Sequence, residues 1–285
     1  MHAEANPDRE PGTEPDREAE TEADGEAGRE AGTGTPAVKH AEPVMGTVVS
    51  FAVVPGRQPG RAAAAVASAC AVLHQADETF STWLPGSPVS RLRRGGAVLA
   101  DLPEAVSHVL DLCAVARKMS GGWYDPWALP GGVDPTGLVK GWAVEQALAV
   151  LRDAGMAAAM VNGGGDIAVF GGPAPGQPWR AGIRHPWRAD ALACVLEVTA
   201  AVATSGSYER GQHLISPVTG RPASLAASAT VTGPSLAFAD ALATALAVGG
   251  DPVLGLIAGL DGYQGYLIRP DGSEADTGGV AFCPA

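Results

Sequence analysis

The chain has 285 residues, 46% of them hydrophobic, and carries a formal net charge of −12. A chain of this length can bury a large core in one domain or in two closely packed halves. The excess of negative charge argues against a nucleic-acid-binding protein, which needs a basic surface.

Residues 1–36 differ from the rest of the chain in composition. They hold eleven acidic residues and three arginines, which gives −8 of the net charge, and no Ile, Leu, Val, Phe, Tyr or Trp. Such a segment cannot bury enough apolar surface to offset the entropy that ordering removes. We therefore expect a disordered acidic tail over residues 1–36 and a single folded domain over residues 37–285.

Targeting signals and membrane spans are not predicted. The first residues lack the basic and apolar regions of a secretory signal, and no run of about 18 apolar residues predicts a span. The four cysteines, Cys70, Cys113, Cys194 and Cys283, show no metal-type spacing. This pattern is typical of small buried side chains in a reducing compartment, and we expect a cytoplasmic protein.

The predicted elements change in kind along the chain. β-branched residues predict a strand over 47–54, and breaker residues delimit helices over 61–80, 103–120 and 140–154. Short apolar runs predict strands over 158–161, 167–170, 179–183, 192–198, 201–204 and 229–231, then a helix over 238–248 and a strand over 263–268. Helices followed by many short strands indicate an α+β fold rather than a regular βαβ array.

The stretch VNGGGDIAVFG, residues 161–171, has the glycine run of a phosphate-binding turn. A dinucleotide fingerprint places a helix after the glycines, so that phosphate meets the helix N-terminus. Here a short apolar run follows Asp166, and the spacing is not G-x-G-x-x-G. The residues alone favour a β-hairpin, whose glycines permit positive φ or a close approach of backbone to a ligand.

Asp240 and Thr244 lie four residues apart in an apolar helical segment, so they share one helix face. A lone carboxylate among Ala and Leu is costly to bury unless it is paired or bound to a metal. Carboxylate and hydroxyl oxygens suit Mg²⁺. A solvent-facing Asp and a Thr bonded to its own backbone would need no metal, and the pattern alone leaves both interpretations open.

Three more residues have two interpretations each. His213, at the predicted end of a short strand, suits a general base or a surface histidine. Lys140, early in the helix that follows Asp134-Pro-Thr-Gly, indicates an anion site or an ordinary capped helix. Trp83, in a Pro/Gly loop, suits stacking on a flat ligand or simple packing.

The order of these motifs along the chain resembles that of the ApbE family, the FAD:protein FMN transferases. The resemblance covers about residues 43–282 and rests on eight ordered segments: VMGT (44–47), TFSTWLPGSPVSRL (79–92), GWYDP (122–126), Asp134 to Lys140 with GWAV, NGGGDI (162–167), TSGSY (204–208), HLISPVTGRP (213–222) and ADALATAL (239–246). It implies an α+β, T-fold-related fold of antiparallel sheets with flanking helices. It also implies a Mg²⁺-dependent enzyme that cleaves FAD, attaches FMN to a Thr or Ser of a target flavoprotein, and releases AMP.

The same resemblance implies a set of site residues. The metal ligands would be Asp240, Thr244 and the carbonyl of Gly137, and His213 would deprotonate the acceptor hydroxyl, with Lys140 as the second catalytic residue. The residues expected to contact FAD are Met45, Trp83, Asp134, Lys140, Gly164, Gly165, Asp166 and Ile215.

The chain departs from the family pattern at two places. Ser216 stands where the family has Asp, and only eight residues separate Asp125 from Asp134, where the family has some tens. Two alternatives to the transferase are therefore kept: a Mg²⁺-dependent FAD pyrophosphatase that forms FMN and AMP, and a flavin-binding protein without catalysis.

Overall fold

The structure is a computed structural model, which describes residues 37–129, 131–206, 216–217, 220 and 225–284. By its internal contacts the chain divides into two units, Met1–Gly34 and Thr35–Ala285. All of the described residues lie in the second unit, and the following account concerns that unit.

An eight-stranded antiparallel sheet organises the described residues, in the order β1-β2-β3-β4-β7-β8-β9-β10. Its first four strands are β1 (Val38–Val44), β2 (Thr47–Val54), β3 (Ala158–Gly163) and β4 (Asp166–Phe170). The others are β7 (Ala201–Gly206), β8 (Ser228–Gly233), β9 (Gln264–Ile268) and β10 (Glu274–Asp276). Short hairpins join neighbours such as β1–β2 and β3–β4, whereas β4 and β7 pair across a long insertion.

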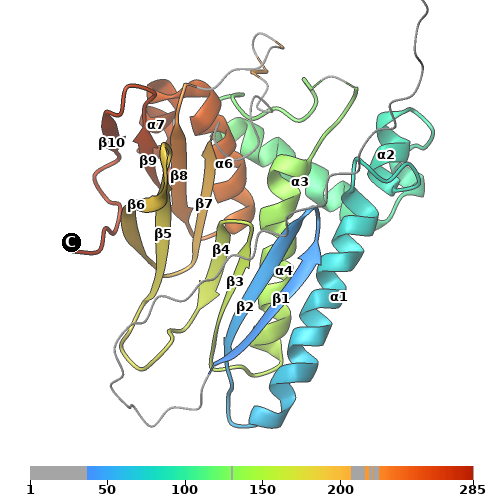
Figure 1. Ribbon diagram of the computed structural model, residues 1–285. Coiled ribbons are helices and arrows are strands. Elements are labelled where there is room, and N and C mark those ends of the chain that lie inside the picture. Colours follow the sequence, from blue (N-terminus) through green and yellow to red (C-terminus); the bar gives the residue numbers. More distant parts are fainter. Residues whose placement is uncertain (1–36, 130, 207–215, 218–219, 221–224, 285) are drawn as a thin grey trace, which may run out of the picture. The chain divides into compact units, whose positions relative to one another are not determined.

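Three long helices pack on one face of this sheet: α1 (Ala62–Phe80), α4 (Thr136–Asp153) and α6 (Leu236–Gly249) (Figure 1). The alternate side chains Val49, Phe51 and Val53 of β2 point toward them and are buried. α6 is apolar on nearly every side, which is typical of a helix at the centre of a core. The other helical segments among the described residues are η1 (Pro59–Arg61), α2 (Pro88–Arg93), η2 (Leu99–Asp101), α3 (Glu104–Met119) and α7 (Asp251–Ile257).

A separate hairpin covers the opposite face of the sheet. It consists of β5 (Trp179–His185) and β6 (Arg188–Val198), which pair only with each other as strands. A second apolar cluster fills the space beneath it, with Trp179 and Leu196 from the hairpin against Val169, Val202 and Tyr266 of the large sheet. The sheet is therefore buried on both faces along its middle.

The structure confirms the α+β class and most of the predicted elements. The glycine stretch at 161–171 is a β-hairpin, with Gly163 paired to Asp166 and no helix after it. One helix begins earlier than expected, at Thr136 instead of Lys140, because Asp134 accepts hydrogen bonds from Thr136 N–H and Oγ1. β1, α2, α7 and β10 were not predicted. Among the described residues, no helix has both the length and the apolar character needed to cross a bilayer.

Candidate active site

The carboxylate of Asp240 lies inside the protein, at the contact between α6 and α4. Its side chain is 3% exposed, and Oδ2 accepts the backbone N–H of Gly141 at 3.1 Å. The backbones of the two helices are in direct contact here, because a Cβ on Gly141 would lie only 2.5 Å from the carbonyl oxygen of Leu236. The sequence interpretation in which Asp240 faces solvent is therefore wrong.

Oxygen-bearing residues from three elements gather one turn further along α6. Thr244 Oγ1 lies 3.4 Å from Ser205 Oγ at the end of β7. Gly137, in the first turn of α4, is close to the same hydroxyl, because a Cβ built on it would lie 3.7 Å from Thr244 Oγ1. Asp240, Thr244 and Gly137, the three expected metal ligands, thus border a common space.

The start of α4 is fixed by Asp134. Its Oδ1 accepts the Thr136 N–H at 3.1 Å, and its Oδ2 pairs with Arg93 Nη1 at 2.5 Å. Arg93 ends α2, so this ion pair ties two segments that are far apart in sequence. A smaller recess of about 380 Å³ beside it is lined by Arg93 and Arg94, which places cationic side chains next to the main cavity.

Lys140 connects the glycine hairpin to the cavity. Its ammonium forms an ion pair with Asp166, whose side chain is 1% exposed. The other oxygen of Asp166 accepts the Thr204 N–H at 3.1 Å. Asp166 therefore holds Lys140 and the end of β7 in place, and it is not itself among the residues that line the cavity.

The turn between β3 and β4 needs its glycines. Gly164 and Gly165 have φ values of 65° and 104°, and a Cβ on Gly164 would lie 2.5 Å from Thr47 Oγ1. Asn162 Oδ1 accepts the Gly165 N–H at 2.7 Å and closes the turn. Neither glycine lines the cavity, so the structure places both in the hairpin that supports Asp166.

Met45 occupies the tight turn between β1 and β2 in a left-handed conformation. Its φ is 55°, which is uncommon for a residue with a long side chain. Its N–H donates to Asp77 Oδ2, near the end of α1, at 3.3 Å. This contact fixes the turn against α1, and both residues line the cavity.

One cavity of about 1010 Å³ brings these groups together. Seven of the residues expected at the site line it: Met45, Trp83, Asp134, Gly137, Lys140, Asp240 and Thr244. Trp83 is 91% exposed, which leaves its ring free to contact a ligand at the rim. Of the other five expected residues, Gly164, Gly165 and Asp166 lie in the β3–β4 hairpin and do not line the cavity, and His213 and Ile215 lie outside the described residues.

Several lining residues were not identified from the sequence. Asp77 and Ser205 are single polar residues at the ends of ordinary elements, and Arg93 is recognisable only through its partner Asp134. Tyr124 lines the cavity beside Gly137, and burial raises its pKa well above the usual range, so the phenol stays protonated. The only sequence signal for it was its place in the GWYDP segment.

Comparisons with known proteins agree with this architecture. The model of the ApbE family matches residues 128–267, which include five of the seven lining residues just named. This segment of the chain is therefore similar to the ApbE family. Within it lie Asp134, Gly137, Lys140, Asp240 and Thr244.

Two curated relatives carry the name FAD:protein FMN transferase. The protein from Rhodobacter capsulatus is 38% identical over 47% of this chain and 27% of its own length. The protein from Vibrio cholerae is 33% identical over 47% of this chain and 47% of its own length. These matches span about a quarter to a half of the relatives.

Solved ApbE structures share the fold over most of the chain. The flavin transferase ApbE from Vibrio cholerae gives a TM-score of 0.74 at 21% identity, covering 85% of this chain and 97% of that one. The apo flavinyl transferase ApbE from Pseudomonas stutzeri also gives 0.74 at 21% identity, covering 87% and 98%.

Proposed function

We propose that the protein is a Mg²⁺-dependent FAD:protein FMN transferase, which attaches FMN to a Thr or Ser hydroxyl of a target flavoprotein and releases AMP. The observation that carries this proposal is the convergence of Asp240, Thr244, Lys140 and Met45 on one cavity. The names of the curated relatives support it.

The dimensions and lining of the cavity suit a dinucleotide. Its volume of about 1010 Å³ is at the upper end of the usual range for small-molecule sites, roughly 300–1,000 Å³. Phe80, Trp83 and Trp123 supply aromatic surface for flat rings, and Lys140 supplies positive charge for phosphate. FAD requires both kinds of contact.

The described residues fit a magnesium ion. Mg²⁺ prefers one or two carboxylates with further oxygens from hydroxyls, carbonyls, water and substrate phosphate. Asp240 offers a buried carboxylate, and Thr244, Ser205 and the backbone of Gly137 offer oxygens beside it. When bound there, the cation would supply charge neutralisation for the pyrophosphate.

The reaction itself needs positioning and a base more than covalent catalysis. The acceptor hydroxyl oxygen forms a bond to the FMN phosphorus, the bond between this phosphorus and the bridging oxygen of the pyrophosphate breaks, and AMP leaves with the bridging oxygen. The hydroxyl proton passes to a base, the role that we assign to His213, outside the described residues. Lys140, held by Asp166, would keep a positive charge beside the phosphates.

The FAD pyrophosphatase remains the second candidate, because the segment between Asp125 and Asp134 is short. Asp134 N–H donates to Pro126 O at 2.9 Å, so the segment folds back on itself at the cavity wall. Asp125, Pro126 and Leu129 line the cavity there. In this alternative, water takes the place of the acceptor hydroxyl.

Incubation of the full-length protein with FAD and Mg²⁺, with and without a flavoprotein domain that has an acceptor Thr, separates the candidates. Covalent fluorescent flavin on the acceptor, absent when that threonine is replaced by valine, supports the transferase. FMN and AMP without acceptor labelling support the pyrophosphatase. Bound FAD that stays intact supports a non-catalytic flavin-binding protein, and EDTA provides the metal-free control.

A further inference from the structure

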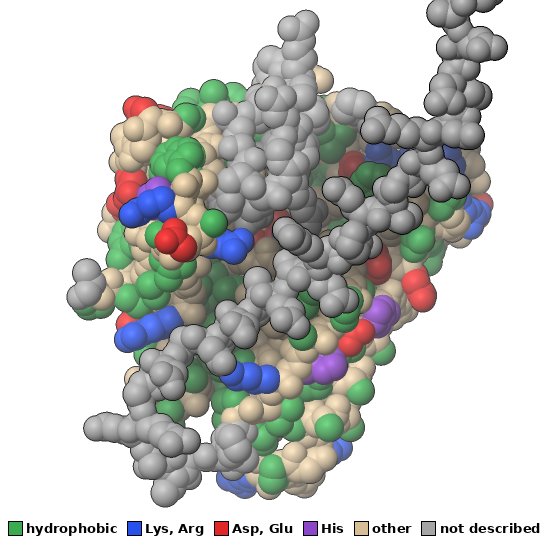
Figure 2. All heavy atoms as spheres, in the orientation of Figure 1, with side chains coloured by type: hydrophobic (Ala, Val, Ile, Leu, Met, Phe, Trp, Pro, Cys, Tyr) green, Lys and Arg blue, Asp and Glu red, His purple; other side chains and the backbone are tan. Residues whose placement is uncertain are grey.

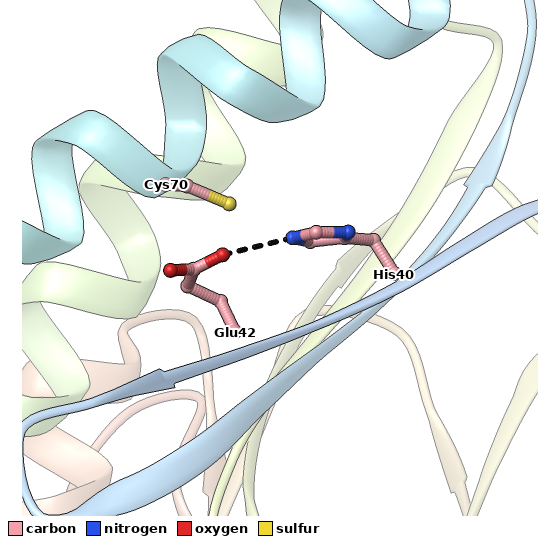
Figure 3. Close-up of side chains that lie close together, drawn as sticks. All are labelled: His40, Glu42 and Cys70. Carbon is pink, nitrogen blue, oxygen red and sulfur yellow. Dashed lines mark hydrogen bonds and ion pairs between the residues drawn. The ribbon is translucent and has the colours of Figure 1, made fainter.

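A second cluster of metal-ligating side chains lies away from the flavin cavity, between β1 and α1. Figure 2 shows histidine side chains (purple) next to acidic ones (red) on the face over these two elements. Its core is His40, Glu42 and Cys70 (Figure 3), whose ligand atoms all lie within 4.8 Å of one another. None of the three lines the cavity described above.

Local structure aims these side chains at one point. His40 and Glu42 are two residues apart on β1, so they project from the same side of the strand. Cys70 and His74 are four residues apart on α1, so they share one helix face. In Figure 3, Cys70 points from the helix toward Glu42 and His40 on the strand.

The donor set is imidazole nitrogen, carboxylate oxygen and cysteine sulfur, which is the combination that zinc uses in proteins. Zn–N bonds of about 2.0–2.1 Å and Zn–S bonds of about 2.3 Å place tetrahedral donors roughly 3.3–3.6 Å apart. His40 Nε2 and Glu42 Oε2 are 3.0 Å apart, so small side-chain rotations would create this geometry. We propose that His40, Glu42 and Cys70 bind a zinc-type divalent cation, with water as the fourth ligand.

His74 supports this site from outside. Its Nε2 lies 2.8 Å from Glu42 Oε1, the oxygen on the side away from His40. Metal-binding carboxylates usually receive such an outer hydrogen bond, and its loss typically lowers metal affinity by about 10- to 100-fold. The side chains of His40 and His74 are about half exposed, which gives a cation access from solvent.

Without a metal, Cys70 holds its proton. Burial, followed by the nearby charge of Glu42, raises the pKa of the thiol to about 11. Metal coordination requires the thiolate and releases this proton. A thiolate-to-metal absorption band at neutral pH is therefore a specific sign that Cys70 has become a ligand.

The position of the site gives it a structural role. β1 is the edge strand of the large sheet, and the cation would join this edge to α1. The same two elements continue to the flavin cavity, where Met45 follows β1 and Asp77 lies one turn after His74. Metal binding would thus reinforce the contact between Met45 and Asp77 at the cavity rim.

Cobalt titration of the metal-free, full-length protein tests the proposal, with saturating Mg²⁺ present to occupy the proposed magnesium site. We expect one equivalent of Co²⁺ with a thiolate charge-transfer band, and displacement of that band by Zn²⁺. Cys70→Ala and His40→Ala should abolish the band. The matched controls Cys194→Ala and His108→Ala, which change residues of the same types elsewhere, should retain it.

His74→Ala distinguishes the outer partner from the ligands. It should keep the band while binding Co²⁺ about 10- to 100-fold more weakly; unchanged affinity would overturn its assigned role. If Cys70→Ala does not fold, His40→Ala, on the exposed edge strand, carries the test alone. Absence of the band in the wild-type protein, or a band that survives His40→Ala, would overturn the proposal.

Discussion

Asp240 combines two properties at a single residue, since it is a buried carboxylate and it faces a hydroxyl one helical turn away. Asp240→Asn keeps an oxygen that can accept the Gly141 N–H but removes the negative charge. We expect the Mg²⁺ concentration for half-maximal FAD turnover to rise by at least about 100-fold. Loss of a group that only hydrogen-bonds a metal ligand already lowers metal affinity by up to about 100-fold, and loss of a ligand should lower it more. The melting temperature should change little.

The variant Asp261→Asn removes one negative charge at an exposed residue that does not line the cavity, and it serves as the control. An unchanged Mg²⁺ requirement in Asp240→Asn would show that this carboxylate is not a metal ligand.

A second prediction about single residues concerns the ion pair of Lys140 with Asp166. Lys140→Met leaves a buried carboxylate without its cation, which should lower the free energy of unfolding by on the order of 3 kcal/mol. The double variant Lys140→Met/Asp166→Asn should regain much of this loss, because the uncompensated charge is gone. Urea unfolding measures all three proteins.

Lys118→Met, at an exposed position of α3, controls for the loss of a lysine. A double variant no more stable than Lys140→Met would contradict the pairing. The sequence indicated each of these two residues, but their contact spans 26 positions, and no local pattern connects them.

At the scale of elements, the contact of α4 with α6 depends on Gly141. A Cβ there would meet backbone atoms of Leu236 and Ala237 at 3.0 Å or less, and backbone cannot rotate away. Gly141→Ala should lower the free energy of unfolding by about 1–3 kcal/mol or more. In contrast, Gly255→Ala, in α7 with open space around it, should raise that free energy by up to about 1 kcal/mol. Equal stabilities of the two variants in urea would refute this role for Gly141.

Glu145 provides a pH-dependent probe of the same helix contact. Its carboxylate accepts the Leu236 N–H at the start of α6, and burial raises its pKa above the ordinary value. A raised folded-state pKa of an acid contributes stability at low pH that is lost as pH rises through that pKa. From roughly pH 4 to pH 7, Glu145→Gln should therefore gain stability relative to the wild type.

Urea unfolding at several pH values checks this trend, with the exposed Glu78→Gln on α1 as the control for charge removal. A difference that moves in favour of the wild type as pH rises would contradict the assignment of burial as the dominant cause.

Element types were predictable where the sequence pattern was strong. The alternating β-branched residues of 47–54 and the alanine-rich 61–80 gave β2 and α1 almost to the residue. β1 was missed because it is an edge strand that carries Lys39, His40, Glu42 and Pro43, residues that are unusual in central strands. The cluster of His40, Glu42 and Cys70 was also missed. Its members come from a strand and a helix, so the sequence has no Cys-x-x-Cys-like spacing that would reveal it.

At the scale of the whole molecule, the cavity collects residues from the β1–β2 turn, α1, α4, β7 and α6. A ligand that bridges these elements must oppose their separation on unfolding. At a free FAD concentration of about 100 times Kd, the free energy of unfolding should rise by about 2.7 kcal/mol. Thermal melts with FAD, with and without Mg²⁺, measure this, and a melting temperature independent of FAD would argue against the cavity as its site.

The sheet order was beyond the reach of sequence reasoning. β4 pairs with β7 across the inserted β5–β6 hairpin, and β2 pairs with β3 although α1 to α4 lie between them. The family resemblance, rather than periodicity, assigned Asp134 and Asp240 to one site, and both line the cavity. Geometry then added Arg93, Asp77 and Tyr124, whose roles depend on partners distant in the chain.

The left-handed backbone of Met45 has a consequence for how the protein can be improved. A non-glycine residue in a sparsely populated backbone region costs on the order of 1–3 kcal/mol, and glycine at this turn would remove that strain. The thioether at the cavity rim would be lost with it. Under the proposed function, the most accessible stabilising substitution in this turn would also remove the proposed contact of Met45 with FAD, so thermostability and flavin affinity would compete at position 45.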